Sequence, residues 1–215
     1  HNYKIHNLTK RNYLQRMLNS KVLCMREAKK YEKNYWDGNR KFGYGGYKYI
    51  PGRWANVAKK LIKRYKLKSG SRVLDVGCGK GFLLYEMLKL QPGLIIHGFD
   101  ISNYALKRVK KNRNLRVYKH KAEKKFPYKK KSFDLVISLA TLHNLKLFDL
   151  AYSIKEIERV GKKKYIMVES FKNDKQLFNL QCWALTCQTF LSVKEWTWLY
   201  KNMKYKGDYE FIFFN

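Results

Sequence analysis

The chain has 215 residues, of which 45% are hydrophobic, which is enough for one domain with a full core and too few for two of ordinary size. Its 47 Lys and Arg residues outnumber 16 Asp and Glu residues, so the formal net charge is +31. A polyanionic partner such as RNA would explain this charge, because counterion release drives such binding. The lysines are, however, spread along almost the whole chain, as an AT-rich coding sequence would produce, and both explanations stay open.

Membrane insertion, secretion and metal binding have no support in the sequence. No apolar run approaches the roughly 18 residues of a membrane span, and HNYKIHNLTK at the N-terminus lacks the apolar stretch of a signal peptide. The cysteines form no C-x-x-C pair and have no histidine at ligand spacing. We therefore expect a soluble, cytoplasmic protein with reduced thiols and no metal.

Residues 1–52 are predicted to form an N-terminal helical cap followed by a lid segment. A first helix would open at Leu8 and Thr9. A second, polar helix is expected over residues 22–36. The first helix would turn one apolar face inward, and that face carries Tyr13, Leu14, Met17 and Leu18.

Residues 41–54 read KFGYGGYKYIPGRW, with four glycines, one proline and five aromatic residues. The glycines would let the chain bend and close over a ligand. The aromatic rings could instead stack on RNA bases. A lid over a small-molecule site, a plain surface turn and an RNA-stacking loop are the interpretations that stay open.

Residues 53–215 are predicted to form a single compact α/β unit. An amphipathic helix over 54–65 leads into it. From residue 72 onward, short apolar runs alternate with helix-length segments, and the runs are RVLDVG, LIIHGFD, LRVYKH, FDLVISLA and KYIMVES. This alternation is typical of a doubly wound, mainly parallel sheet with helices on both sides.

The C-terminal part adds two helical segments and a strand. The aromatic stretch LFNLQCWALTCQTFL at 177–191 is either an acceptor pocket wall or a helix pair that covers the core. Ser192 and Glu195 have the spacing of a capping box and predict the start of another helix. The run KGDYEFIFF predicts a final strand.

The run VLDVGCGKG at 73–81 indicates a ligand site. Asp75 is followed by three glycines spaced G-x-G-x-G, at the end of the first predicted strand. Phe82 stands where a dinucleotide site needs a small residue, which argues against nicotinamide binding. A glycine turn before a helix lets a ligand approach the backbone, and Asp100, which ends the next strand, could accept hydrogen bonds from ribose hydroxyls. The pattern predicts an adenosine-type ligand without a pyrophosphate.

From about residue 53 to 170, the sequence resembles the class I S-adenosylmethionine-dependent methyltransferases. The resemblance rests on VLDVGCGKG together with HGFDIS at 97–102 and FDLVISLATLHNL at 133–145. It implies a seven-stranded, mainly parallel sheet, with S-adenosyl-L-methionine as cofactor and S-adenosyl-L-homocysteine as product. The chain departs from many members at Lys121, where an acidic residue would precede the alanine of the segment that edges the adenine.

The same resemblance implies which residues contact the cofactor. Asp75 and the glycine turn would face its amino-acid part, Asp100 would hold the ribose hydroxyls, and Ile101 would pack on the adenine. Residues 121–123 would edge the adenine ring, and the end of the fourth strand would lie near the methionine portion. The implied set is Asp75, Gly77, Cys78, Gly79, Asp100, Ile101, Lys121, Ala122, Glu123, Leu139 and Ala140.

The predicted catalytic residues are His143, Glu169 and Tyr44. His143 could act as a general base or only brace its loop, and Glu169, at the end of the fifth strand, could position the acceptor or be structural. Tyr44, or alternatively Tyr47 or Tyr49, could shield the positive sulfonium with its ring. The predicted substrate-binding residues are Tyr47, Arg53, His143, Asn144 and Trp183, and for Arg53 a solvated position is the alternative.

Taken together, these features predict transfer of a methyl group to an O or N atom of a small polar acceptor. The basic surface favours an anionic one, such as a phosphorylated or nucleotide-linked metabolite. The absence of an N/D-P-P-Y/F motif after the fourth strand, and of a cysteine pair, argues against a nucleic-acid base as acceptor. Two rivals stay open: an RNA methyltransferase that uses its lysine-rich surface, and an inactive binding module of methyltransferase fold. The sequence does not indicate the oligomeric state.

Overall fold

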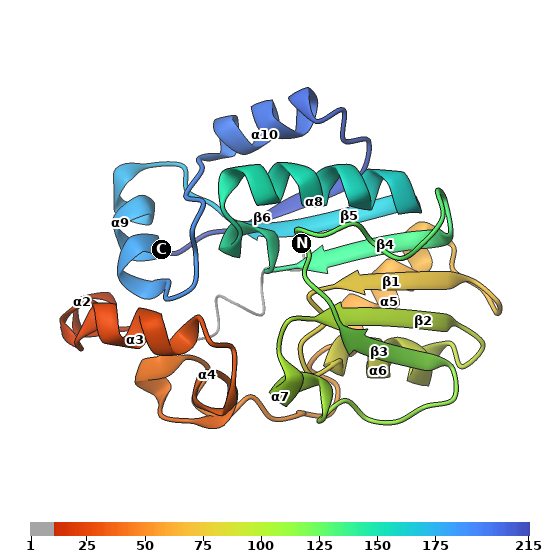
Figure 1. Ribbon diagram of the computed structural model, residues 1–215, viewed down its shortest axis with the longest axis horizontal. Coiled ribbons are helices and arrows are strands. Elements are labelled where there is room, and N and C mark those ends of the chain that lie inside the picture. Colours follow the sequence, from red (N-terminus) through yellow and green to blue (C-terminus); the bar gives the residue numbers. More distant parts are fainter. Residues whose placement is uncertain (1–10) are drawn as a thin grey trace.

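The computed structural model describes residues 11–215, which build around a parallel sheet (Figure 1). The strand order is β3-β2-β1-β4-β5-β6, and every neighbouring pair is parallel. The described residues thus form six strands where the resemblance implies seven, while the predicted doubly wound architecture is confirmed. The strands are β1 (Arg72–Val76), β2 (Ile95–Asp100), β3 (Leu115–Lys119), β4 (Phe133–Leu139), β5 (Gly161–Glu169) and β6 (Asp208–Ile212).

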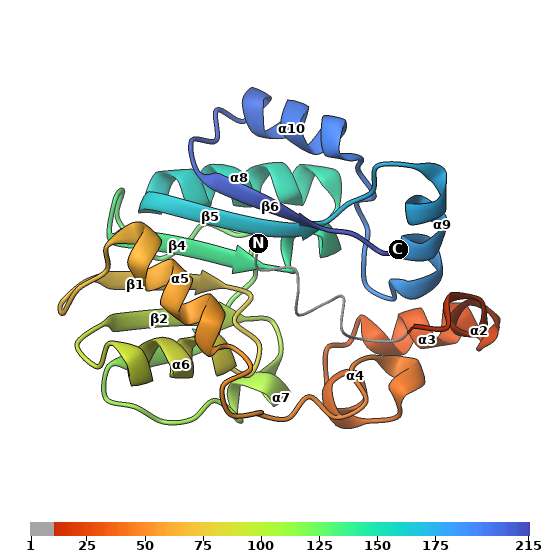
Figure 2. The ribbon, with the colours of Figure 1, turned by 180° about the vertical axis from the view of Figure 1, so that it is seen from behind.

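Helices cover both faces of the sheet because alternate strand residues feed two separate cores. Val73 and Ile96 belong to the core under helices α5 (Ala55–Tyr65) and α6 (Phe82–Leu90), which lie in front of the sheet in Figure 2. Leu74 belongs to the core under α8 (Leu147–Val160) and α10 (Val193–Asn202), on the opposite face. Strands buried on both faces explain the continuous apolar runs of the sequence.

Residues 13–42 form a lobe of short helices beside the sheet (Figure 1). The helix predicted over 22–36 is in fact two helices, because Tyr31 has a left-handed φ of +52° and its carbonyl accepts hydrogen bonds from Trp36 and Ser102. The predicted opening at Leu8 and Thr9 lies outside the described residues. The lobe contains α2 (Tyr13–Leu18), α3 (Lys21–Ala28), α4 (Lys33–Asp37) and the 3₁₀ turn η1 (Arg40–Phe42).

Only part of the apolar face predicted for helix α2 is turned inward, since Tyr13 packs against the core. Leu14 and Leu18 are 61% and 78% exposed, whereas Arg16 is buried. The Arg16 guanidinium donates hydrogen bonds to the carbonyls of Arg40 and Trp183, and these contacts turn the polar side of α2 inward. The lobe is anchored there to α9 (Asp174–Trp183), which lies beside it in both views.

The C-terminal segments follow the predicted pattern in part. The capping box at the start of α10 is confirmed, with both reciprocal hydrogen bonds between Ser192 and Glu195 present. The aromatic stretch 177–191 is not a helix pair: α9 ends at Trp183, and a segment without regular secondary structure follows. Two backbone amides of that segment, those of Gln188 and Thr189, donate to the His143 carbonyl and place the segment against the ends of the central strands.

Within residues 11–215, no helix is both long and apolar enough to cross a membrane. The same residues contain no group of His, Cys, Asp and Glu side chains able to hold a metal ion.

Candidate active site

A cavity of about 690 Å³ lies between the carboxyl ends of the strands and the N-terminal lobe. Its volume falls in the range of small-molecule sites, roughly 300–1,000 Å³, and its position is the usual one for ligands of open α/β sheets. Every residue predicted for the site lines it: Tyr44, Tyr47, Arg53, Asp75, Gly77, Cys78, Gly79, Asp100, Ile101, Lys121, Ala122, Glu123, Leu139, Ala140, His143, Asn144, Glu169 and Trp183. Which of them contact a ligand stays a prediction.

The turn after β1 is built so that two carboxylates face the cavity. Gly77 and Gly79 have φ of +83° and +54°, which a glycine adopts without strain. The Gly79 amide donates to Asp100 at 2.8 Å, and the Ser102 amide donates to the other oxygen of the same carboxylate, also at 2.8 Å. These bonds fix the Asp100 carboxylate and leave lone pairs for a further donor.

Asp75 is the less satisfied of the two carboxylates. Its residue is 5% exposed, and its Oδ1 atom has no hydrogen-bond partner among the described residues. Burial, followed by the charge of Asp100, raises the pKa of Asp75 to about 8. A buried acceptor without a partner costs free energy until a donor or a cation reaches it.

The N-terminal lobe covers the glycine turn with aromatic rings. A Cβ added at Gly79 would come within 2.9 Å of the Trp36 ring, so the indole lies directly over the turn. Tyr44 stacks on Trp36 with ring centroids 5.3 Å apart, and Tyr47 packs on Phe82 at 5.0 Å. The segment around 41–54 thus forms one wall of the cavity.

An ion pair ties this wall to the glycine turn. Lys80 is 5% exposed, and its ammonium lies 2.6 Å from the Asp37 carboxylate and 2.8 Å from the Tyr47 carbonyl. Although burial alone would raise it, hydrogen bonds from Lys80 and Tyr104 hold the pKa of Asp37 below its usual value. A lysine within the G-x-G-x-G run therefore holds the lobe in place.

Buried His143 pairs with partly buried Glu169 at the ends of β4 and β5. The Glu169 amide donates to His143 Nδ1 at 3.2 Å, so the remaining ring proton is on Nε2, which lies 3.3 Å from the Glu169 carboxylate. Burial lowers the pKa of His143 to about 3, so the ring is neutral. Burial also raises the pKa of Glu169 to about 7, although Arg11 opposes the shift.

The other predicted residues lie around these groups. Ile101 is 39% exposed at the cavity edge, and Lys121 forms an ion pair with Glu123 at 3.8 Å. Ala140 has a left-handed φ of +55° at the turn that follows β4. Tyr49, the alternative to Tyr44 and Tyr47, is not among the lining residues, and its hydroxyl donates to Glu86 on α6.

Three arginines in the cavity wall were missed by the sequence reasoning. Arg11, Arg16 and Arg40 each place a guanidinium 4.9–5.4 Å from the centre of the Trp183 ring. They come from the start of the chain, α2 and η1 and meet a tryptophan at the end of α9. Sequence spacing carried no signal for this cluster, because its members are brought together only by the fold.

Comparison with known proteins shows the family and the fold of the chain. The profile of a family described as methyltransferase domain matches residues 67–210. The chain is 34% identical over 113 residues to the ribosomal RNA small subunit methyltransferase C of Buchnera aphidicola (strain APS), covering 51% of this chain and 32% of that protein. It is 30% identical over 109 residues to the mouse mitochondrial arginine-hydroxylase NDUFAF5, covering 51% of this chain and 31% of that protein. The chain thus spans about a third of the length of each of these relatives.

Solved structures share the fold at low identity. A putative methyltransferase from Bacillus halodurans superimposes with a TM-score of 0.57 at 19% identity, covering 69% of this chain and 68% of that one. The phospholethanolamine N-methyltransferase 2 of Haemonchus contortus, solved with phosphomonomethylethanolamine and S-adenosylhomocysteine, gives 0.56 at 18% identity, covering 91% of this chain and 44% of that one.

Proposed function

The chain belongs to the methyltransferase-domain family, whose class I members use S-adenosylmethionine, and from this premise we propose that it transfers a methyl group to an O or N atom of a small polar, anionic acceptor. The observation that carries the proposal is the cavity itself. It joins the Asp75 and Asp100 carboxylates on the sheet side to the His143–Glu169 pair at the neighbouring strand ends.

The residues at the ends of β1 and β2 fit the cofactor. Asp75 offers a buried oxygen that lacks a partner among the described residues, suited to a cationic amino group, and Asp100 is held by two amides in a position to accept from ribose hydroxyls. Trp36 and Tyr44 present aromatic faces, which attract a sulfonium. When bound, the cofactor supplies a methyl group already activated for displacement, so the chain has mainly to align and desolvate the acceptor.

We assign the general base to Glu169, with His143 as a positioning residue. The Nδ1 lone pair of His143 is occupied by the Glu169 amide, and its Nε2 proton faces the Glu169 carboxylate. The carboxylate has a pKa near 7, the range in which a base works best at neutral pH. Glu169 would take the proton that a hydroxyl or ammonium group of the acceptor loses.

The experiment combines cofactor binding with an acceptor screen. The purified protein would be incubated with S-adenosylmethionine and pools of phosphorylated, hydroxylated and amine metabolites, and release of S-adenosylhomocysteine would be measured. We expect turnover with at least one small-molecule pool. Cofactor binding without turnover in any pool would instead favour the inactive binding module.

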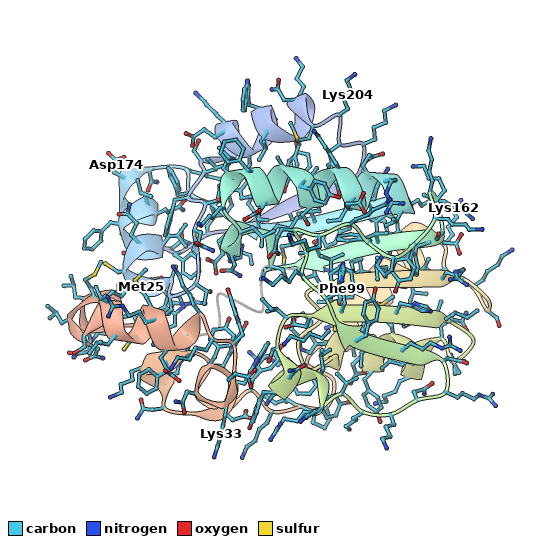
Figure 3. The ribbon with its side chains drawn as sticks, viewed as in Figure 1. Met25, Lys33, Phe99, Lys162, Asp174 and Lys204 are labelled. Carbon is cyan, nitrogen blue, oxygen red and sulfur yellow. The ribbon has the colours of Figure 1, made fainter. Side chains whose placement is uncertain are left out.

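An RNA acceptor is the second candidate, favoured by the formal charge of +31 and by the similarity to a ribosomal RNA methyltransferase. Lys33, Lys162 and Lys204 lie on different edges of the molecule and point away from it, so positive charge is not confined to one face (Figure 3). Transfer RNA and ribosomal RNA fragments would be titrated at 50 and 200 mM salt. Specific recognition would retain affinity at the higher concentration, whereas binding through dispersed charge would fall by orders of magnitude, ~10³-fold or more for six phosphate contacts.

A further inference from the structure

The cavity has acidic side chains on its sheet side and basic side chains on its lobe side. The sheet side has the carboxylates of Asp75 and Asp100, and the lobe side has the guanidiniums of Arg16 and Arg40. Among residues 11–215, no ion pair joins either of these arginines to a carboxylate. Residues 1–10 contain no Asp or Glu, so they supply no acidic partner either. Arg16 and Arg40 are therefore two neighbouring cations for which the described residues supply no acidic partner.

Arg16 is the buried centre of this positive wall. It is 8% exposed, and its Nη1 and Nε atoms donate to the carbonyls of Arg40 and Trp183. Burial, followed by the charge of Arg40, lowers the pKa of Arg16 to about 10. Five N–H groups belong to a guanidinium, and two of its nitrogens are already committed, so further donors remain for a ligand.

Arg40 completes the wall from the 3₁₀ turn. Its Nη1 donates to the Gly43 carbonyl at 2.5 Å, which fixes the head of the side chain over the Trp183 ring. Burial, followed by the charge of Arg11, lowers the pKa of Arg40. The ring holds these cations close together, and an anion bound between them would remove the repulsion.

We propose that Arg16, Arg40 and the face of Trp183 form a subsite for a phosphate monoester group of the methyl acceptor. A phosphate monoester carries a charge of about −1.5 to −2 at neutral pH and has three acceptor oxygens. It therefore matches two or more guanidiniums better than a carboxylate group of a ligand would. This inference rests on the proposed function, because it divides the cavity into a cofactor half on the sheet side and an anionic acceptor half on the lobe side.

A second hollow of about 620 Å³ supports this location. Arg16, Arg40 and Trp183 line both cavities, so they form the wall between them. The second hollow is lined by polar side chains of the lobe, among them Asn12, Gln15 and Asn39. An anionic group at the shared wall would therefore meet the guanidinium donors of Arg16 and Arg40.

The test uses the full chain saturated with S-adenosylhomocysteine and inorganic phosphate as the probe, titrated by calorimetry and ³¹P NMR. Arg40→Met removes one guanidinium of the wall. Lys41→Met removes the same charge from the neighbouring residue, which lines the second hollow but not the main cavity. We expect the Arg40 variant to bind phosphate at least tenfold more weakly than wild type, and the Lys41 variant to stay within twofold. Equal affinity of wild type and Arg40→Met, or no saturable phosphate binding by wild type, would overturn the subsite.

Two further measurements distinguish a wrong subsite from a wrong function and from a nucleic-acid ligand. S-adenosylhomocysteine should bind with the same affinity to wild type and to both variants. If wild type does not bind S-adenosylhomocysteine, the proposed function is wrong, whatever the outcome for the subsite. A short single-stranded RNA serves as the phosphodiester probe. If Arg40→Met weakens RNA binding as much as it weakens phosphate binding, the wall reads a nucleic-acid backbone, and the small-molecule subsite is wrong.

Discussion

At the scale of single residues, buried carboxyl groups dominate the site. Asp75 and Glu169 have pKa values of about 8 and 7, both raised chiefly by burial, and His143 is kept neutral beside Glu169. The sequence predicted that His143 and Glu169 lie at neighbouring strand ends. It could not predict which of the two is the general base, because that depends on which ring nitrogen of His143 the Glu169 amide reaches.

Cofactor affinity should rise with pH below the pKa of Asp75. Near pH 6 to 7 the free protein holds a proton on Asp75, and the cationic cofactor favours the carboxylate, so binding releases this proton. We expect affinity to rise by up to about tenfold per pH unit in this range. Calorimetry in two buffers of different ionisation enthalpy would show the proton release. In Asp75→Asn both the pH dependence and the released proton should be largely lost, and an unchanged slope would contradict the assignment.

Glu169→Gln should slow methyl transfer to a hydroxyl acceptor by ~10²–10⁴-fold, the usual contribution of a positioned base. In wild type the rate should rise with pH through about pH 7 as Glu169 loses its proton. The pH–rate profile of Glu169→Gln should lack this rising limb. His143→Gln should lower the rate less than Glu169→Gln does, because it removes only the group that orients the Glu169 carboxylate. Its pH–rate profile should keep the rising limb, at a shifted pH. A limb that survives Glu169→Gln but disappears in His143→Gln would assign the base to the histidine.

At the scale of elements, the N-terminal lobe is where sequence reasoning was weakest. The sheet could be predicted because its strands are short, apolar and ordered. The burial expected for Leu14 and Leu18 of helix α2 was wrong, because Arg16 is turned inward and donates to two carbonyls beside the Trp183 ring. These partners lie 24 and 167 residues away in the chain and leave no periodic pattern.

The ion pair between Lys80 and Asp37 should hold the lobe over the glycine turn. Lys80→Met removes the cation. Because Asp37 keeps partial solvent contact, we expect the free energy of unfolding to fall by ~1–3 kcal/mol, less than for a fully buried pair. Hydrogen exchange should quicken in residues 36–47 and stay unchanged in β1 and β4. Lys89→Met, which breaks a half-exposed pair with Glu86, is the matched control. Equal protection of residues 36–47 in both variants would mean that the pair does not anchor the lobe.

The aromatic residues of the lobe give a separate test of the lid. Tyr44 stacks on Trp36, which covers the glycine turn, so Tyr44→Ala should weaken cofactor binding by ~1 kcal/mol or more through the lost aromatic face. Tyr49 packs on α6 outside the cavity, and Tyr49→Phe should leave affinity unchanged. If Tyr44→Ala keeps full cofactor affinity and activity, residues 41–54 are a plain surface turn and not a lid.

At the scale of the whole molecule, acids with raised pKa values, above all Asp75 and Glu169, make the free protein less stable at high pH. Stability should fall as pH rises from about 6.5 to about 8, because the folded state still holds protons on Asp75 and Glu169 that the unfolded state has lost. Below about pH 6.5 the protonation of His143 in the unfolded state opposes this fall. Urea unfolding across this range should show the decline, and Asp75→Asn should flatten it. A free energy of unfolding that rises toward pH 8 would contradict the raised values.

The central claim is that the cavity between the strand ends and the lobe binds the methyl donor, and titration of S-adenosylhomocysteine by calorimetry tests it most directly. We predict saturable binding of one ligand per chain. We also predict that Asp100→Ala weakens it by ~2–3 kcal/mol, as for a charge-assisted hydrogen-bonding pair. No binding by the wild-type chain, or the same affinity in Asp100→Ala, would contradict the account.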